Sequence, residues 1–182
     1  IADRHPQGSA PVRLAWFPGP EGAGWVGFVE AGFRDAIANS AAEIVLTKFG
    51  DTGREIQVTL VEETLDSGIE IDYIVGSAPT AEVAVSILRA RGLEGRINIV
   101  SDYMSHAVFR GIRRGRILAA PTDFPIMQGK LAIEMAVRAI EGTLDTRHAG
   151  PRIQLVTPDM VGNTDLAETL APASFIPVFE LD

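Results

Sequence analysis

Five apolar stretches recur along the chain, and each ends in small or polar residues. They are VRLAWFPGP (12–20), AEIVLTKFGDT (42–52), IDYIVGSAP (71–79), RINIVSDYM (96–104) and ILAAPTDFP (117–125). Short apolar runs bounded by turn residues are typical of parallel strands buried on both faces. Each stretch therefore predicts a buried parallel strand, with ends marked by Gly19, Asp51, Ser77, Asp102 and Asp123.

A helical pattern follows each predicted strand. The expected helices span 24–40, 53–67, 79–91, 105–114 and 126–141, and most of them stop at a glycine, which suits a helix C-terminus. Thr52 to Glu55 read as a capping box, and Ser105 reads as an N-cap. The last of these helices is expected to turn one apolar set inward: Ala132, Met135, Ala136, Ala139 and Ile140.

This alternation of strands and helices predicts an α/β fold, a Rossmann-like parallel sheet with helices on both faces. A final short strand is expected at 152–157 and a short helix near 164–170. The rest of the tail, 159–182, reads as a strap across the surface, and its FIPVFE segment (175–180) is apolar enough to pack against something.

The polar strand ends are the candidate site, because ligands of open α/β sheets bind outside the carboxyl ends of the strands. Ser77, Asp102, Tyr103 and Asp123 together offer acceptors, hydroxyls and one aromatic ring for a small polar ligand, and Asp51 ends a further strand. A local alternative stays open for two of them, since Ser77 and Asp123 are also placed to cap the helices that follow.

Aromatic residues gather at the junction of the first strand and helix. Both tryptophans of the chain, Trp16 and Trp25, lie there beside Phe17. Aromatic faces bind methylated ammonium groups and the apolar faces of sugars, although Trp16 is equally placed to be a core residue. The nearby glycines, GPEGAG (19–24), lack the G-x-G-x-x-G order of a dinucleotide loop and the G-K-[ST] of a phosphate loop.

Composition excludes several functions. The formal net charge is −8, and the one basic cluster, RGIRRGR (110–116), reads as the solvated end of a helix, so a nucleic-acid partner is disfavoured. With no cysteine, the chain has no disulfide, thiolate metal site or cysteine nucleophile. The three histidines lack metal-ligand spacing, and no catalytic constellation is evident, so we expect no enzyme, no metal and no cofactor. No apolar run is long enough to span a membrane.

Several segments carry a resemblance to a known family. The strand–polar end–helix units, and ILAAPTDFPIMQGKLAIEMAVRAIEG near the end, resemble type I periplasmic binding proteins, the superfamily that includes sugar binders and LacI-like sensor domains. Within it, the chain is similar to the periplasmic sensor-partner proteins of the trimethylamine N-oxide respiratory system. The segments that carry this are RHPQGS, IDYIVGSA, VSDYMSH, FRGIRRGRILAAPTD and QGKLA.

The resemblance implies a periplasmic protein with two lobes, a small-molecule ligand and a membrane sensor histidine kinase as partner. It also implies that the chain is a C-terminal fragment whose N-terminal lobe is missing. In this division, 1–11 is a linker from the missing lobe, 12–122 the C-terminal lobe, 123–149 a helix of the other lobe, 150–158 the return and 159–182 the tail. The family's aromatic box would include Tyr103, while Ser77, Asp102, Asp123 and Asp51 or Thr52 match ligand-contacting strand ends.

Two departures affect the expected ligand. The loop 19–29 adds Trp25, and Asp102 stands where an apolar residue is expected, which is closer to the sugar-binder pattern. Both departures fall on the ligand rim, so they favour a ligand other than trimethylamine N-oxide itself. The function that the resemblance implies is sensing of trimethylamine N-oxide or a similar solute. The alternatives are a solute-binding subunit of a sugar uptake system, the sensor domain of a LacI-like regulator and a Rossmann-type enzyme.

Overall fold

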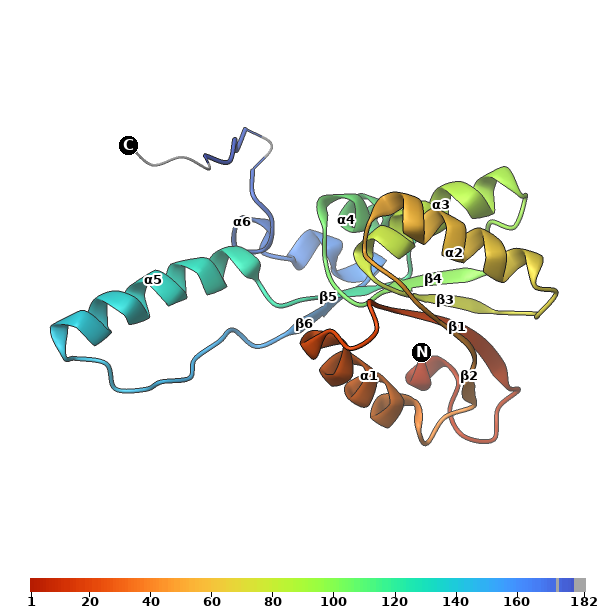
Figure 1. The fold of residues 1–182 in the computed structure, drawn as a ribbon, viewed down its shortest axis with the longest axis horizontal. Helices are drawn as coiled ribbons and strands as arrows, with labels where there is room; N and C mark the ends of the chain where they lie inside the picture. The colour runs from red at the N-terminus through yellow and green to blue at the C-terminus, as the bar shows by residue number, and fades with distance from the viewer. Residues whose placement is uncertain (173, 179–182) are drawn as a thin grey trace.

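A four-stranded parallel sheet forms the body of the molecule (Figure 1). The computed structural model describes residues 1–172 and 174–178. The strand order is β2-β1-β3-β4, with β1 (Val12–Gly19) between β2 (Ala42–Phe49) and β3 (Tyr73–Gly76), and β4 (Asn98–Ser101) at the edge. A short 3-10 helix, η1 (Ala2–Arg4), precedes the sheet.

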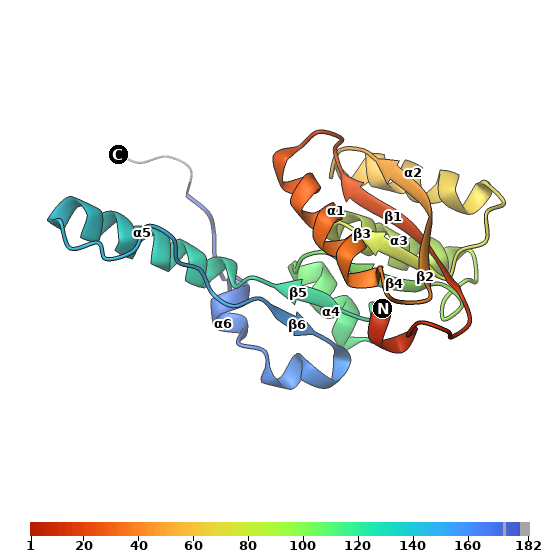
Figure 2. The same cartoon turned by 90° about the horizontal axis from the view of Figure 1, so that it is seen from below.

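Helices cover both faces of this sheet, as the sequence predicts (Figures 1 and 2). Successive side chains of a strand point to opposite faces. Leu14 and Trp16 accordingly pack with helix α1 (Gly24–Ile37). Ala15 and Phe17 join the larger core. That core also includes residues of α2 (Arg54–Asp66), α3 (Ala78–Ala90) and α4 (His106–Arg113).

The fifth apolar stretch departs from the prediction of a parallel strand. It runs beside β4 only briefly, where Leu118 N donates to Ile99 O at 2.8 Å and Ser101 N to Ala119 O at 3.0 Å. The chain then leaves the sheet as β5 (Ala120–Thr122), which pairs antiparallel with β6 (Gln154–Val156). The expected strand therefore splits between two partners.

Four helices end at the predicted glycines, whereas the caps expected from Thr52 to Glu55 and from Asp123 do not form. Gly68, Gly92, Gly115 and Gly142 all have positive φ, which glycine adopts without a Cβ clash. Ser77 and Ser105 are N-caps whose hydroxyls accept from backbone N–H groups. The expected capping box is absent at the start of α2, because Gly53 is the N-cap there and no side chain caps it.

The cap of α5 (Pro125–Glu141) is also unexpected. Phe124, and not Asp123, is its N-cap, in the left-handed conformation with φ of 55°. A non-glycine residue in this region is uncommon. Thr122 Oγ1 accepts from Phe124 N at 3.2 Å and so supports the turn.

Helix α5 extends away from the body, and the chain then returns toward β6 (Figures 1 and 2). None of its residues is buried. Of the apolar set expected to face inward, Met135 is half-buried and the other four residues are exposed, so the described residues leave most of this set uncovered. The 3-10 helix η2 (Pro158–Asn163) and α6 (Leu166–Thr169) follow β6. Helix α6 fits the predicted short helix. Of the FIPVFE segment, Phe175, Ile176 and Val178 are exposed, and 179–180 lie outside the described residues.

Candidate functional site

A cavity of about 520 Å³ lies at the carboxyl ends of the strands. The chain passes from β1 outward to β2 and then crosses β1 to reach β3, so the direction of winding changes between β1 and β3. Open α/β sheets bind ligands at such a switch point. The lining combines aromatic, apolar and acidic side chains from five segments: Trp25, Val29, Thr52, Asp102, Tyr103, Met104, Pro121, Asp123, Pro125 and Ile153.

Trp25 reaches the cavity because the end of β1 is a glycine. Gly19 has a φ of 117°, and a Cβ built on it would lie 2.6 Å from Trp25 Cη2. The indole therefore packs directly over the backbone of the strand end. Trp25 remains 41% exposed, which leaves ring surface available to a ligand.

Asp102 is the most unusual group of this cavity. Both of its carboxylate oxygens are buried without a hydrogen-bond partner among the described residues. Burial raises the pKa of this carboxyl from 3.8 to about 7, because the charged form loses its solvation, although the nearby N–H of its own backbone acts in the opposite direction. Its own backbone N donates to Gly76 O at 2.9 Å, which ties the loop to the end of β3.

Tyr103 stands next to Asp102 and is 37% exposed. Ser101 Oγ donates to Tyr103 O at 2.8 Å and fixes the backbone between β4 and α4. Burial raises the pKa of the Tyr103 phenol, and the neighbouring Asp102 charge adds to that shift. The hydroxyl therefore stays protonated and can donate as well as accept.

Asp123 and Thr52 complete the polar lining from the opposite loops. Asp123 is exposed and lines the cavity, and its backbone carbonyl oxygen accepts from Gln128 Nε2 at 2.7 Å. Asp51 is not part of the lining. Its Oδ1 accepts from Gly53 N at 3.0 Å, so it holds the turn that presents Thr52.

Ser77 and Trp16 are both buried and do not line the cavity. Ser77 is 0% exposed, and its hydroxyl lies 2.8 Å from Thr80 Oγ1. Trp16 stacks on Phe33 at a centroid distance of 4.4 Å, on the face covered by α1. Of the seven residues expected from the sequence, the structure thus gathers Trp25, Asp102, Tyr103 and Asp123 around one cavity, and leaves out Ser77, Trp16 and Asp51.

A buried polar chain beneath the cavity was not expected from the sequence. Thr80 Oγ1 donates to Gln57 Oε1 at 2.7 Å, and Gln57 Nε2 donates to Asp51 O at 2.7 Å. With Ser77, these residues join the ends of β2 and β3. The signal was present in the sequence as a glutamine and a threonine at helical positions that face the sheet, but their pairing needs the tertiary structure.

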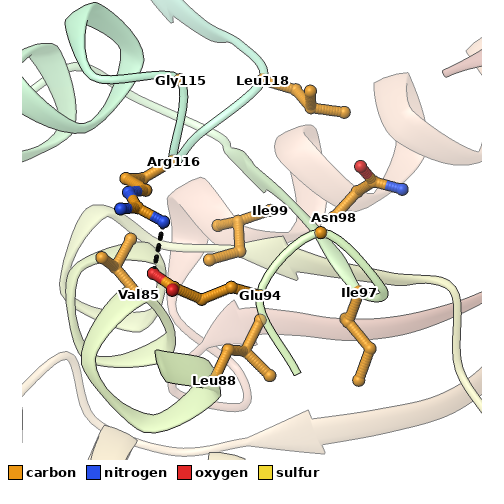
Figure 3. A pocket seen from close by; sticks show the side chains of 10 residues that line it. Val85, Leu88, Glu94, Ile97, Asn98, Ile99, Gly115, Arg116 and Leu118 are labelled. Carbon is orange, nitrogen blue, oxygen red and sulfur yellow. Dashed lines mark hydrogen bonds and ion pairs between the residues drawn. The ribbon is translucent and has the colours of Figure 1, made fainter. Parts of the chain in front are cut away.

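A second cavity lies at the opposite, amino-terminal end of β4 and is much smaller (Figure 3). It holds about 70 Å³, against about 300–1,000 Å³ for typical ligand pockets. Arg116 Nη1 and Glu94 Oε1 form an ion pair across it at 2.5 Å, so its charged groups already satisfy each other.

Within residues 1–172 and 174–178, no cluster of three or more histidine, aspartate or glutamate side chains could hold a metal ion. Over the same residues, no helix has the length and apolar character needed to cross a bilayer. The arrangement can hold an organic solute between aromatic and acidic groups.

Comparison with known proteins gives several matches. "Periplasmic protein TorT" of Escherichia coli K12 is 37% identical over 169 residues, which are 93% of this chain and 49% of that protein. The chain thus spans about half the length of the curated relatives it matches. A solved complex of the TorS sensor domain with TorT, without ligand, matches with a TM-score of 0.91 and 38% identity, covering 97% of this chain and 59% of the matched one.

A further solved structure is an ABC transporter solute binding protein from Bradyrhizobium sp. BTAi1 with bound Bis-Tris. It is 43% identical, with a TM-score of 0.90, and the match covers 98% of this chain and 54% of that one. These relatives are described as binding or sensor-complex proteins. The family described as periplasmic binding proteins and sugar binding domain of LacI family matches residues 1–169. The chain belongs to this family of periplasmic binding proteins and LacI-type sugar-binding domains.

Proposed function

We propose that this chain is the ligand-binding part of a periplasmic protein that senses a small solute, trimethylamine N-oxide or a similar compound, and signals to a TorS-like membrane sensor histidine kinase. The observation that carries the proposal is the cavity at the strand ends, where Trp25 and Tyr103 meet Asp102 and Asp123. The expected periplasmic location agrees with the curated relative, which is a periplasmic protein.

The aromatic and acidic groups contact different parts of the solute. The rings of Trp25 and Tyr103 form the walls and contact the methyl groups of an alkylated nitrogen, since the ring face attracts cationic carbon–nitrogen groups. Asp102 and Asp123 pair with the cationic head of the solute. Ser77 and Asp51 support this site from behind through their hydrogen bonds, and Trp16 supports it through the packing of α1.

The exposed apolar helix supports the division into lobes. Residues 12–122 make one lobe, 123–149 belong to the other, 150–158 return and 159–182 form the tail. Ile133, Val137 and Ile140 of α5 are 69%, 44% and 88% exposed, a surface that the rest of a two-lobed protein would cover. A solute that contacts both lobes only when they are closed would shift the population toward the closed state.

A kinase partner is supported by the relatives. The solved TorS sensor domain–TorT complex in the presence of trimethylamine N-oxide matches with 37% identity and a TM-score of 0.89. Closure of the lobes would change the surface that such a partner contacts. No nucleic-acid partner is part of this proposal.

The test is a calorimetric titration of the full-length protein with trimethylamine N-oxide, related methylamines and a panel of sugars. Binding should disappear in the double variant Tyr103→Ala with Asp102→Ala and persist in Asp35→Ala, which changes an exposed residue of α1 outside the lining. Unchanged binding by the double variant would refute the site. Binding that also alters association with a TorS-like sensor domain would support the signalling role.

A second candidate is a solute-binding subunit of an ABC uptake system. It is favoured by the match at 43% identity to an ABC transporter solute binding protein that holds Bis-Tris, a hydroxylated amine. Binding of sugars or polyols alone, together with association with a permease and not with a kinase, would establish this alternative.

A further inference from the structure

The Asp102 carboxyl has no hydrogen-bond donor among the described residues. A buried polar group without a hydrogen bond costs free energy, and a buried charge costs more. Both oxygens of Asp102 are in this position. Asp102 also lines the cavity, so a turn of its side chain would bring these oxygens against a solute there, and the solute would then supply the missing donors.

The groups around Asp102 decide the sign of the charge that the cavity favours. Helix α1 presents Trp25 and Val29, the loop after β2 presents Thr52, and the segment after β5 presents a second carboxylate, Asp123. Tyr103 adds a protonated phenol. None of the described lining residues is basic. An anion would therefore meet two carboxylates without a compensating charge, whereas a cation would meet complementary groups.

We infer that the solute of this cavity is a small organic cation that carries at least one N–H or O–H donor, and that it binds the ionised form of Asp102 and displaces a proton. This deepens the proposed solute-binding function and rests on it. A protonated alkylamine satisfies the inference, because its N–H donates to the carboxylate while its methyl groups contact the rings of Trp25 and Tyr103. A donor-free solute such as an amine oxide cannot pair with the ionised carboxylate and would bind only by accepting from the protonated form, so the inference narrows the proposed solute class to protonated amines.

Proton release on binding follows from the protonation state of Asp102 before the solute binds. Burial raises the pKa of Asp102 to about 7, so near neutral pH about half of the carboxyls carry a proton. A bound cation stabilises the carboxylate and lowers that pKa. Affinity for a cation should therefore rise with pH up to about 7 and then level off, while an acceptor solute that binds the protonated form should show the opposite slope.

The experiment compares three probes with the full-length protein: trimethylammonium, tetramethylammonium and trimethylamine N-oxide. The first two share charge and similar size but differ in one N–H donor, and the third is a neutral acceptor. We expect trimethylammonium to bind about tenfold or more tightly than tetramethylammonium, as a charge-assisted hydrogen bond implies. Its affinity should rise about tenfold between pH 6 and pH 8.

Calorimetry in buffers of different ionisation enthalpy should show about half a proton released per ligand near pH 7. Asp102→Asn should abolish this release and the pH dependence, and Asp35→Asn, at an exposed carboxylate of α1 outside the lining, should preserve both. Circular dichroism establishes that the variants fold.

Three results would overturn the inference: equal binding of the two ammonium ions, affinity that rises as the pH falls, or no cation binding at any pH. If trimethylamine N-oxide or a sugar then binds and Tyr103→Ala removes that binding, the ligand class is wrong but the solute-binding function stands. If no solute binds, both the class and the proposed function fall.

Discussion

The sheet body and the helix that leaves it teach different lessons about the same kind of sequence. Both carry regular apolar positions. In β1 and β3 these positions are buried, with Leu14, Phe17 and Ile74 each 0% exposed. In α5, Ile133 and Ile140 are 69% and 88% exposed. Periodicity thus predicts which side chains form an apolar face. It does not predict whether another segment packs against that face.

The largest expected difference between the two regions is in stability. Ile74→Ala in the body removes buried methyl groups and leaves a void, so we expect a loss of about 2–5 kcal/mol in the free energy of unfolding. Ile140→Ala on α5 should change it by less than about 0.5 kcal/mol in the 182-residue chain. Urea unfolding measures both. Equal losses for the two variants would contradict the contrast. If another lobe covers α5, Ile140→Ala should destabilise the full-length protein more than it destabilises the 182-residue chain.

Within the sheet body, the Asp102 carboxyl is buried without a hydrogen-bond partner among the described residues. The pKa of Asp102 is raised above its unfolded value, so the folded state holds a proton that the unfolded state has lost between about pH 4 and pH 7. The contribution of Asp102 to stability therefore falls as pH rises through that window and is constant above it.

Replacing this residue isolates the effect from other titrating groups. We expect the stability of Asp102→Asn relative to the parent to increase by roughly 4 kcal/mol between pH 4 and pH 8, as the size of the pKa shift implies. Unfolding curves at both pH values provide the measurement. A difference that does not vary with pH would show that this carboxyl is paired or solvated in the folded protein.

A smaller effect is expected where the body meets the cavity. Gly19→Ala places a Cβ against the Trp25 ring and forces an unfavourable φ, so we expect a loss of about 1–3 kcal/mol together with weaker solute binding. Gly22→Ala is the matched control, because Gly22 also has positive φ but no atom lies within 4 Å of a built Cβ. It should cost stability through backbone strain and leave binding intact. Loss of binding in both variants would show that the contact between Gly19 and the Trp25 ring is not what binding depends on.

The smallest effect concerns how α5 is held. Lys130 Nζ lies 2.6 Å from Glu168 Oε1 and links α5 to α6. Surface ion pairs contribute about 0–1 kcal/mol, so Lys130→Ala should barely alter global unfolding. Amide hydrogen exchange in α5 should nevertheless become faster at low salt than in the parent. No change in exchange would show that other contacts position this helix.

The body was largely predictable from sequence because each of its signals is local. Strand runs, helix periods and terminal glycines such as Gly68 and Gly92 each depend on neighbouring residues. The fate of the fifth strand was not predictable in this way, since pairing with β4 or with β6 is decided by distant parts of the chain.

The candidate site was likewise predictable only where its signals are local. Strand ends indicated the rim, and Trp25, Asp102, Tyr103 and Asp123 do line one cavity. Strand position alone could not show which face Trp16 occupies, because a shift of one residue exchanges the two faces of a strand. Nor could it show that the Ser77 hydroxyl is already engaged by Thr80.

The polar chain from Ser77 through Thr80 and Gln57 to the backbone of Asp51 has a consequence for the thermodynamics of association. It fixes the loops after β2 and β3 during folding, before any solute arrives. Binding then requires little ordering of these loops, so the entropy lost on complex formation is confined to the solute and the few side chains that contact it. A preorganised rim of this kind allows a small molecule with few contacts to bind tightly.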